Sequence, residues 1–527
     1  MKHTFDRFGF VVKFTHFSEQ DYKDFLIDYE QLKNYRANHW LKYTIDNVLP
    51  DKSHSLKQSI RKGIPDSLRP QCWLKYSGAA ALASNHPGLY SHLTFKEEND
   101  IRKGFCIKTS RIFEHIASIE KDLYRTFPTN TKFKHKLKKN DERLPNLDAE
   151  SSSDDELSYS FSPMSPTPGI QDEANPYILS LRNILVAFAY YSWPHPNPSN
   201  VLPRKCSYKI GYCQSLNLIV GMLLLVFTTC DKETERLFEA RDEAKTRELE
   251  DSIFWMLVAI VEILLPPEVY GEKLSGSQIQ QTILWEKLLE EQGDHLELEE
   301  LSLWLQSFNS SSPTSRISQR RKTQHLEEIE QYVRNTVKKG PSLSMVTTPW
   351  FLTLFVEMAP VETVLRIWDC FFYQGEKILF KVALTIIQLN KEQLVKCTDI
   401  SDAWKVLRDF PKRAFQCEQF MNLCFQRQVR RPSISTSFSR FFGFGRADSA
   451  PPETTLSTIA LRESLRENTD PFDVNLETSA GGLKNKGIQK LRGIVFEEQH
   501  IMKTSNQSLS GSLPMPILAP PNLTYKE

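Results

Sequence analysis

Two short stretches of this sequence place a polar side chain where it could act on another molecule. In Ile119–Asn130, IEKDLYRTFPTN, Asp122 and Arg125 are three residues apart, so they are neighbours on one helix face. Pro128 then forces the helix to stop. An arginine at a helix end, backed by a carboxylate one turn earlier, is a guanidinium fixed in direction. Taken alone, the pair is also what an ordinary surface ion pair looks like.

The second stretch is Lys209–Leu225, KIGYCQSLNLIVGMLLL. Tyr212, Gln214 and Asn217 precede or open a helix that is otherwise almost wholly apolar. A glutamine beside such a run is costly to bury unless it is hydrogen-bonded. Gln214 therefore either caps local structure or faces a partner, and capping is the simpler of the two interpretations.

A third stretch, Arg61–Trp73, reads RKGIPDSLRPQCW. Its Gly-Ile-Pro turn opens a helix, because Pro65 suits a first helical turn. Asp66 or Ser67 then lies near the positive end of the helix dipole. By itself the stretch predicts only a helix start.

Together and in this order, the three stretches resemble the TBC-domain Rab GTPase-activating proteins. GIPDSLRPQCW is similar to the opening motif of that family, IEKDLYRT to its IxxDxxR motif and GYCQ to its YxQ motif. The resemblance continues through DSIFWMLVAIVEILLPPEVYGEKLSG and Trp350–Leu384, and spans Arg61–Phe415 apart from the insertions. IxxDxxR is short and weak alone, but the ordered set of four motifs is specific.

The resemblance implies a GTPase activator that works with two fingers rather than an enzyme with a substrate of its own. Arg125 would be the arginine finger, stabilising charge that develops on the γ-phosphoryl group, and Gln214 would position the attacking water. The partner would be a Rab-family small GTPase in its GTP form. No cofactor of the chain's own is implied, because GTP and Mg²⁺ are bound by the partner, and no metal ligands are expected.

Supporting roles also follow from the resemblance. Asp122 would orient the arginine finger, and Tyr212 would contact the GTPase or support the glutamine loop. Ser215 and Leu216 depart from the Gly-Met that usually follows the glutamine, so the local backbone is expected to tolerate the change or to differ.

Two further residues of the opening motif, Arg69 and Trp73, are expected to buttress the finger helix. Within RIWDCFF, Trp368 and Asp369 have the character of structural rather than catalytic residues.

The elements that must position these residues are helices. In Arg111–Phe127 the apolar residues Ile112, Ile116, Ile119 and Leu123 fall on one helix face. Four other segments have the same period, and no convincing strand is found. We therefore predict an all-α fold, and the resemblance implies a two-lobed multi-helix domain of the TBC type.

The chain divides by composition. Residues 1–57 are predicted as a helical lead-in and 58–428 as the TBC domain. Polar insertions at 136–174 and 310–321 and a tail at 429–527 are predicted to be disordered, because they lack the apolar content of a core.

Bulk composition narrows the function further. Lys and Arg total 66 against 65 for Asp and Glu. The chain therefore lacks the large excess of basic residues that would indicate general nucleic-acid binding. The nine cysteines include no CxxC pair, which favours reduced thiols in a cytosolic protein and offers no zinc site.

Membrane association is expected to be peripheral at most. The N-terminus lacks a signal-peptide core, and the longest apolar run, Leu218–Phe227, is far shorter than the roughly 20 residues that span a bilayer. This predicts a soluble, cytoplasmic protein. Ser437–Arg446, SFSRFFGFGR, could dock on an anionic endomembrane or a partner groove, or fold back on the helical body.

Other functions stay open as rivals. One is a catalytically idle TBC-type scaffold that binds a GTPase without activating it, although such a domain has no need of both Arg125 and Gln214. A helical adaptor without any GTPase is the second. A hydrolase is a distant third, since no P-loop or nucleophile–histidine set is found. The sequence leaves the identity of the Rab and the oligomeric state open.

Overall fold

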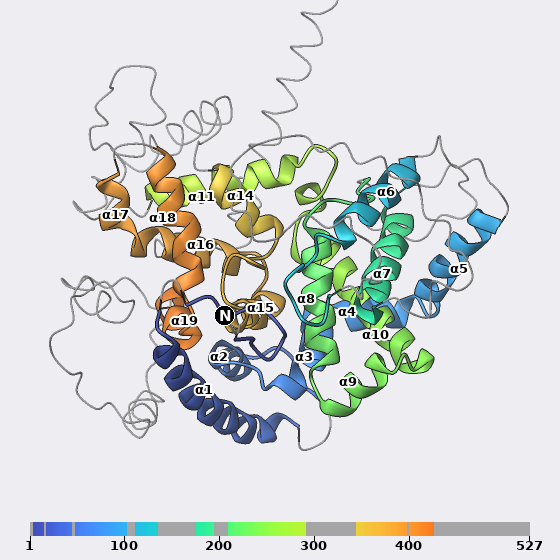
Figure 1. The fold of residues 1–527 in the computed structure, drawn as a ribbon, viewed down its shortest axis with the longest axis horizontal. Helices are drawn as coiled ribbons and strands as arrows, with labels where there is room; N and C mark the ends of the chain where they lie inside the picture. The colour runs from blue at the N-terminus through green and yellow to red at the C-terminus, as the bar shows by residue number, and fades with distance from the viewer. Residues whose placement is uncertain are drawn as a thin grey trace, which may run out of the picture. The chain divides into compact units, whose positions relative to one another are not determined.

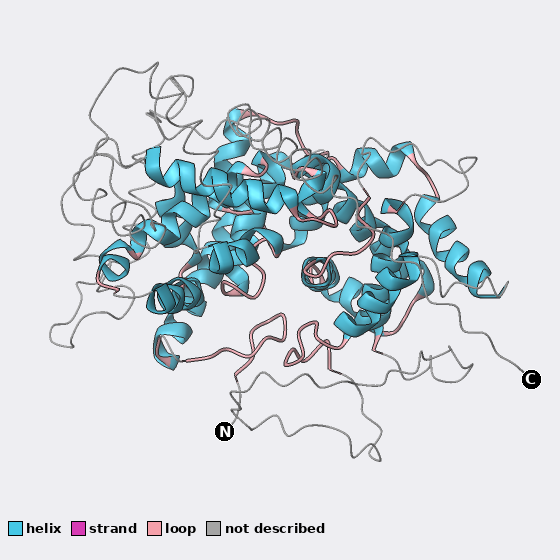
Figure 2. Ribbon diagram, turned by 90° about the horizontal axis from the view of Figure 1, so that it is seen from above, coloured by secondary structure: helices cyan, strands magenta, loops and turns pink. Residues whose placement is uncertain are grey.

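The computed structural model describes residues 4–14, 17–44, 48–102, 111–134, 175–193, 209–290, 344–397 and 400–425. The two predicted insertions, the predicted tail and Ser437–Arg446 lie outside these ranges. Within them the ordered elements are helices, and the only β feature is an isolated bridge between Phe5 and Val11 (Figures 1 and 2). The predicted all-α fold is confirmed.

One group of helices surrounds α8, the apolar helix that follows the Gln214 loop. In it, α8 packs against α6, α7, α9 and α10, while α10 also packs against α4, α5 and α7 (Figure 1). The bounds are α4 Ala79–Asn85, α5 Leu89–Arg102, α6 Arg111–Leu123, α7 Pro176–Ser192, α8 Leu216–Thr228, α9 Lys232–Glu239 and α10 Glu243–Ala259.

A second group gathers around α15, which packs against α2, α16 and α19, and α16 in turn contacts α14, α17 and α18. The bounds are α2 His54–Lys62, α14 Ser344–Leu352, α15 Val361–Gln374, α16 Lys377–Leu389, α17 Lys391–Val395, α18 Ile400–Arg413 and α19 Cys417–Phe425. The long α1, Glu19–Trp40, joins this group through a hydrogen bond from Tyr29 to Glu362 of α15, 2.8 Å long.

Helix α3, Arg69–Ser77, links the two groups, because it packs against α15 as well as α4, α8 and α10. Two groups of helices sharing one connecting helix are what the predicted two-lobed fold requires. Helix α2 runs across the expected boundary between residues 57 and 58, so the lead-in and the domain meet inside a helix.

Short helices complete the described chain: η1 Leu41–Tyr43, η2 Asp66–Leu68, the π-helix η6 Ile260–Leu264 and η7 Pro267–Val269. Helix α11, Ser275–Glu290, contains the boundary between two compact units, the second of which begins at Ile279. In the described ranges no helix has the length and apolar character needed to cross a bilayer.

Candidate functional site

The predicted arginine lies just beyond the end of α6. The helix ends at Leu123, and the Arg125 N–H closes a turn on the Asp122 carbonyl at 3.1 Å. The Asp122 side chain is 8% exposed and that of Arg125 is 73% exposed, with 3.9 Å between the Arg125 Nη1 and the Asp122 Oδ1. The Asp122 carboxylate is therefore buried, whereas the neighbouring Arg125 guanidinium is open to solvent.

A hydrogen bond connects this helix end to the glutamine loop. The Tyr212 hydroxyl donates to Asp122 Oδ2 at 2.8 Å, and both side chains are buried. Burial and the adjacent Asp122 charge raise the pKa of Tyr212 well above its ordinary value, so the hydroxyl stays protonated and remains a donor. Asp122 thus contacts both predicted motifs. The Tyr212 hydroxyl is thereby turned toward the end of α6.

The loop places Gln214 on the surface. Gln214 is exposed, and among the described residues its side chain has no hydrogen bond that would make it a cap. Upstream, the Tyr212 N–H donates to His115 Nδ1 of α6 at 3.1 Å. Gly211 packs so closely on the His115 ring that a Cβ there would overlap it. The loop is held by α6 while the glutamine side chain stays outside.

The departure from the family pattern at Ser215 has a structural consequence. Its φ is 105°, in the left-handed region that glycine enters without steric cost and serine does not. Ser215 is the N-cap of α8 but makes no side-chain capping bond. Its N–H donates instead to Asn217 Oδ1 at 3.2 Å. The backbone keeps the conformation suited to glycine, at a strain of about 1 kcal/mol.

A second connection between the motifs was not predicted. Asn217, buried at the start of α8, donates to Thr126 Oγ1 at 2.8 Å, and Thr126 Oγ1 donates to the Asp122 carbonyl at 2.7 Å. A Cβ on Gly221, one turn further along α8, would lie 2.8 Å from the Phe127 ring. The signal for this contact was Asn217, a polar residue inside an apolar helix that must find a buried partner.

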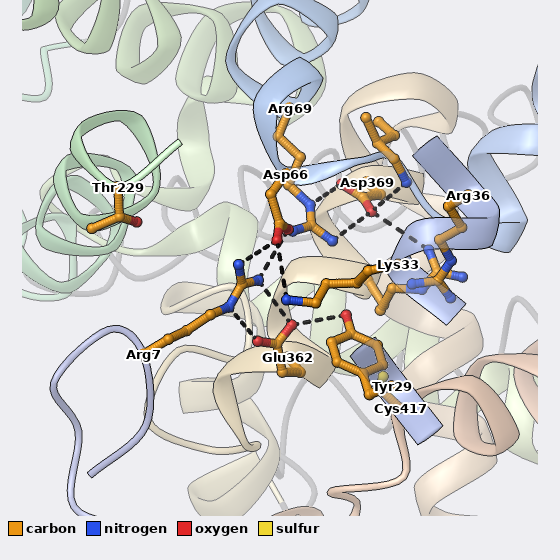
Figure 3. Close-up of polar contacts among 12 residues, drawn as sticks. Arg7, Tyr29, Lys33, Arg36, Asp66, Arg69, Thr229, Glu362, Asp369 and Cys417 are labelled. Carbon is orange, nitrogen blue, oxygen red and sulfur yellow. Dashed lines mark hydrogen bonds and ion pairs between the residues drawn. The ribbon is translucent and has the colours of Figure 1, made fainter. Parts of the chain in front are cut away.

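Arg69 and Trp73 have a different place from the one expected. Both are buried, and they donate to Asp369 Oδ1 of α15 at 3.1 and 3.0 Å. The backbone N–H of Ile64 donates to the other carboxylate oxygen at 3.1 Å (Figure 3 shows Arg69 on Asp369). Their contacts fix α3 to α15, so the expected buttress of the finger helix is corrected to a buttress between the two helix groups.

Asp369 and Trp368, the two residues of RIWDCFF that were expected to be structural, are both buried. Asp369 is the acceptor just described, and the Trp368 indole donates to the Leu354 carbonyl at 2.9 Å. In the described part of the chain, no three His, Cys, Asp or Glu side chains gather as metal ligands would.

Comparison with known proteins agrees with the motifs and the fold. The family model for the Rab-GTPase-TBC domain matches residues 160–308 and 302–395, a region that includes Gln214 and begins after Arg125. GTPase-activating protein MSB4 of Saccharomyces cerevisiae is 28% identical over 424 residues, which are 78% of this chain and 66% of that protein. GTPase-activating protein GYP3 of the same yeast is 28% identical over 74% of this chain, but only 51% of that protein is covered.

Among solved structures, the Chlamydomonas flagellar RabGAP TBC domain matches with a TM-score of 0.50 at 22% identity, over 80% of this chain and 100% of that one. At this identity the likeness concerns the fold. The chain thus carries a match to the Rab-GTPase-TBC domain, is similar to curated GTPase-activating proteins, and has a fold similar to that of a solved RabGAP TBC domain.

Proposed function

We propose that this protein accelerates GTP hydrolysis by a Rab-family small GTPase and supplies Arg125 and Gln214 in trans. The observation that carries the proposal is the Tyr212–Asp122 hydrogen bond of 2.8 Å. It joins the helix end that bears an exposed arginine to the loop that bears an exposed glutamine. Two exposed polar side chains, Arg125 and Gln214, are thereby attached to one buried framework.

In the proposed reaction the Rab binds GTP and Mg²⁺, and this chain adds no cofactor. Arg125 stabilises the charge that develops on the γ-phosphoryl and leaving oxygens, which is worth roughly 10³ to 10⁵ in rate, or about 4 to 7 kcal/mol. Gln214 orients the attacking water, a task that many GTPases give to a glutamine of their own.

The test is single-turnover hydrolysis of GTP by a panel of purified Rab proteins, with the full chain in excess. We expect strong acceleration on at least one Rab and none with the Arg125→Ala variant. The rival proposal, an idle scaffold, is supported if a Rab in its GTP form binds tightly but hydrolyses GTP at its intrinsic rate.

We further propose that the protein works in the cytoplasm and meets its Rab at endomembranes in vesicle traffic. Ser437–Arg446 is the proposed membrane contact, because its phenylalanines and arginines suit an anionic lipid surface. Co-sedimentation with phosphatidylserine vesicles, compared between the full chain and a variant with the four phenylalanines changed to serine, tests this contact. Equal binding of the full chain and the variant to the vesicles would rule out this membrane contact.

A further inference from the structure

Residues 4–12, which precede α1, form a closed turn that we call the N-terminal hook. Its two arms meet in the bridge between Phe5 and Val11. Inside it, the Asp6 carboxylate accepts hydrogen bonds from the backbone N–H groups two and four residues later, both at 2.9 Å. Gly9 has a φ of 89°, a conformation that glycine adopts easily. The hook is thus a defined local structure rather than a loose chain end.

The hook lies against the segment that follows α6. We call residues 124–131, which include the proposed arginine finger, the finger segment. The Thr131 N–H donates to the Gly9 carbonyl at 2.9 Å, and the buried Asn130 side chain donates to the Phe8 carbonyl at 3.0 Å. A Cβ on Gly9 would overlap Thr131 Oγ1. The two segments are therefore in close backbone contact.

Phe127 is held between the hook and α8. Its ring meets that of Phe10 edge to face, with the centroids 4.9 Å apart, and on the α8 side it packs on Gly221. Phe127 is 1% exposed and has a φ of 50°, which a non-glycine residue keeps only when its surroundings hold it there. This buried, strained residue is two positions from Arg125.

The other side of the hook is anchored on distant parts of the chain. The Arg7 guanidinium pairs with Asp66 of η2 and with Glu362 of α15, the latter through Nε at 2.7 Å (Figure 3). Glu362 also accepts the hydrogen bond from Tyr29 of α1, and Lys33 of α1 lies 3.7 Å from Asp66. A planar guanidinium that binds two carboxylates on different elements fixes direction as well as distance.

We propose that the N-terminal hook positions the arginine finger, so that residues 4–12 belong to the catalytic domain rather than to a separable lead-in. The finger segment lies beyond the last turn of α6 and has no helical ladder to fix it. Its orientation therefore depends on packing against α8 and against the hook. A displacement of about 1 Å at a reacting group can lower a rate by about 100-fold. The proposal rests on the proposed role of Arg125.

The test uses Phe10→Ala and Arg7→Ala in the full chain, with GTP hydrolysis by a responsive Rab measured in single turnover at increasing concentrations of this protein. We expect the rate at saturation to fall by roughly 10-fold or more, while the half-saturating concentration changes by less than about 3-fold, because the surface that binds the Rab is retained. Arg7→Lys should lie between Arg7→Ala and the wild type, since lysine lacks the guanidinium fork.

Two control variants separate positioning from general damage. Arg236→Ala removes an arginine from an exposed ion pair on α9 and should leave the rate at saturation unchanged. Leu407→Ala opens a cavity in α18, where Leu407 is fully buried, and lowers global stability away from the finger segment. At a temperature where all variants stay folded, it should also keep the wild-type rate at saturation.

Hydrogen exchange gives a readout independent of any Rab. In Phe10→Ala and Arg7→Ala, amides of residues 124–131 should exchange at least about 10-fold faster, while those of α18 keep their rates. Unchanged exchange in the finger segment overturns the proposal, as does faster exchange with an undiminished rate at saturation. If the wild-type chain activates no Rab at all, the proposed function fails, and the exchange data alone then decide whether the hook holds the finger segment.

Discussion

Two sites in this molecule place arginine beside aspartate but differ in how far the arginine is exposed. They are the Asp369 cluster, formed by Asp369 with Arg69 and Arg366, and the finger site, formed by Asp122 and Arg125. In the cluster, Arg69 and Arg366 are 1% and 0% exposed and both reach Asp369, which is 1% exposed. At the finger site Asp122 is also buried, at 6% exposed, but its arginine Arg125 is 73% exposed. Because the arginines of the Asp369 cluster are buried and hydrogen-bonded within the protein, they can stabilise the packing of helices but cannot contact another molecule. The Arg125 guanidinium, which is mostly exposed, has donors open to solvent, as the proposed finger role requires.

Arg125→Ala has the largest expected effect and tests whether the exposed arginine acts in hydrolysis rather than in stability. Stimulated GTP hydrolysis should fall by roughly 10³-fold or more, while the midpoint of thermal unfolding stays the same because an exposed side chain is lost. Arg125→Lys should be severely impaired as well, because lysine makes no forked contact. Arg236→Ala, on an equally exposed arginine, serves as the control, and near-normal stimulation by Arg125→Ala would refute the finger assignment.

The second variant, Asp369→Ala, should have its effect on stability. It removes the acceptor of the buried Trp73 indole and of Arg69 Nε, while Arg69 keeps its pair with Asp66. We therefore expect a loss of about 3 to 5 kcal/mol in the free energy of unfolding, measured with urea. Hydrolysis per folded molecule should stay near the wild-type value. A loss of less than about 1 kcal/mol, the usual range of a surface pair, would mean that the cluster is not structural.

Tyr212→Phe tests the bond that joins the two motifs. It removes the hydroxyl that donates to Asp122, which should cost about 1 to 3 kcal/mol and lower stimulated hydrolysis by roughly 10-fold as the glutamine loop loosens. Tyr373→Phe, whose hydroxyl donates to the Ser53 carbonyl away from the site, is the matched control. Equal effects of both variants on hydrolysis would show that the Tyr212 bond has no special role.

Ser215→Gly should increase the stability of the fold slightly. It relieves a φ of 105°, which predicts a stabilisation of about 1 kcal/mol with hydrolysis retained. Ser215→Ala keeps the strain and should show no gain in thermal unfolding. Destabilisation by the glycine variant would mean that the serine side chain contributes more than its backbone costs.

The smallest expected effect is a dependence on pH at His115. Burial lowers the pKa of His115 below its ordinary 6.5, so the folded state favours the neutral ring that accepts the Tyr212 N–H. Its contribution to stability is therefore complete above pH 6.5 and is lost as the pH falls through the folded pKa. The unfolding midpoint of His115→Asn should fall less than that of the wild type between pH 7 and pH 5, two values chosen to bracket the ordinary pKa of histidine at about 6.5. Parallel curves would contradict this.

The sequence predicted what depends on near neighbours in the chain. Helix periodicity placed Ile116, Ile119 and Leu123 on one face of α6, which is buried. The spacing of Asp122 and Arg125 predicted that their side chains are neighbours, and they lie 3.9 Å apart. The order of the motifs then indicated the family. Local pattern and resemblance were sufficient for the all-α fold.

The sequence did not predict contacts between residues far apart in the chain. Tyr212 and Asp122 are separated by 90 positions and Arg69 and Asp369 by 300, so no spacing rule connects them. For the same reason the sequence did not predict the contact of the hook with the finger segment, and Arg69 and Trp73 were expected to buttress the finger helix rather than to bind Asp369 of α15. The positive φ at Ser215 was not predicted, because serine rarely adopts such a conformation. A glycine at this position would have indicated it.

The claim that one framework supplies both fingers is tested most directly by exchanging glutamines between the partners. Stimulated single-turnover hydrolysis is measured for the wild-type chain and for Gln214→Ala, each with a responsive Rab and with the same Rab lacking its own water-positioning glutamine. We expect the wild-type chain to stimulate both forms of the Rab, and Gln214→Ala to lose roughly 100-fold or more with either. The reverse pattern, with the glutamine of the Rab essential and Gln214 dispensable, would contradict the account and leave a single arginine finger.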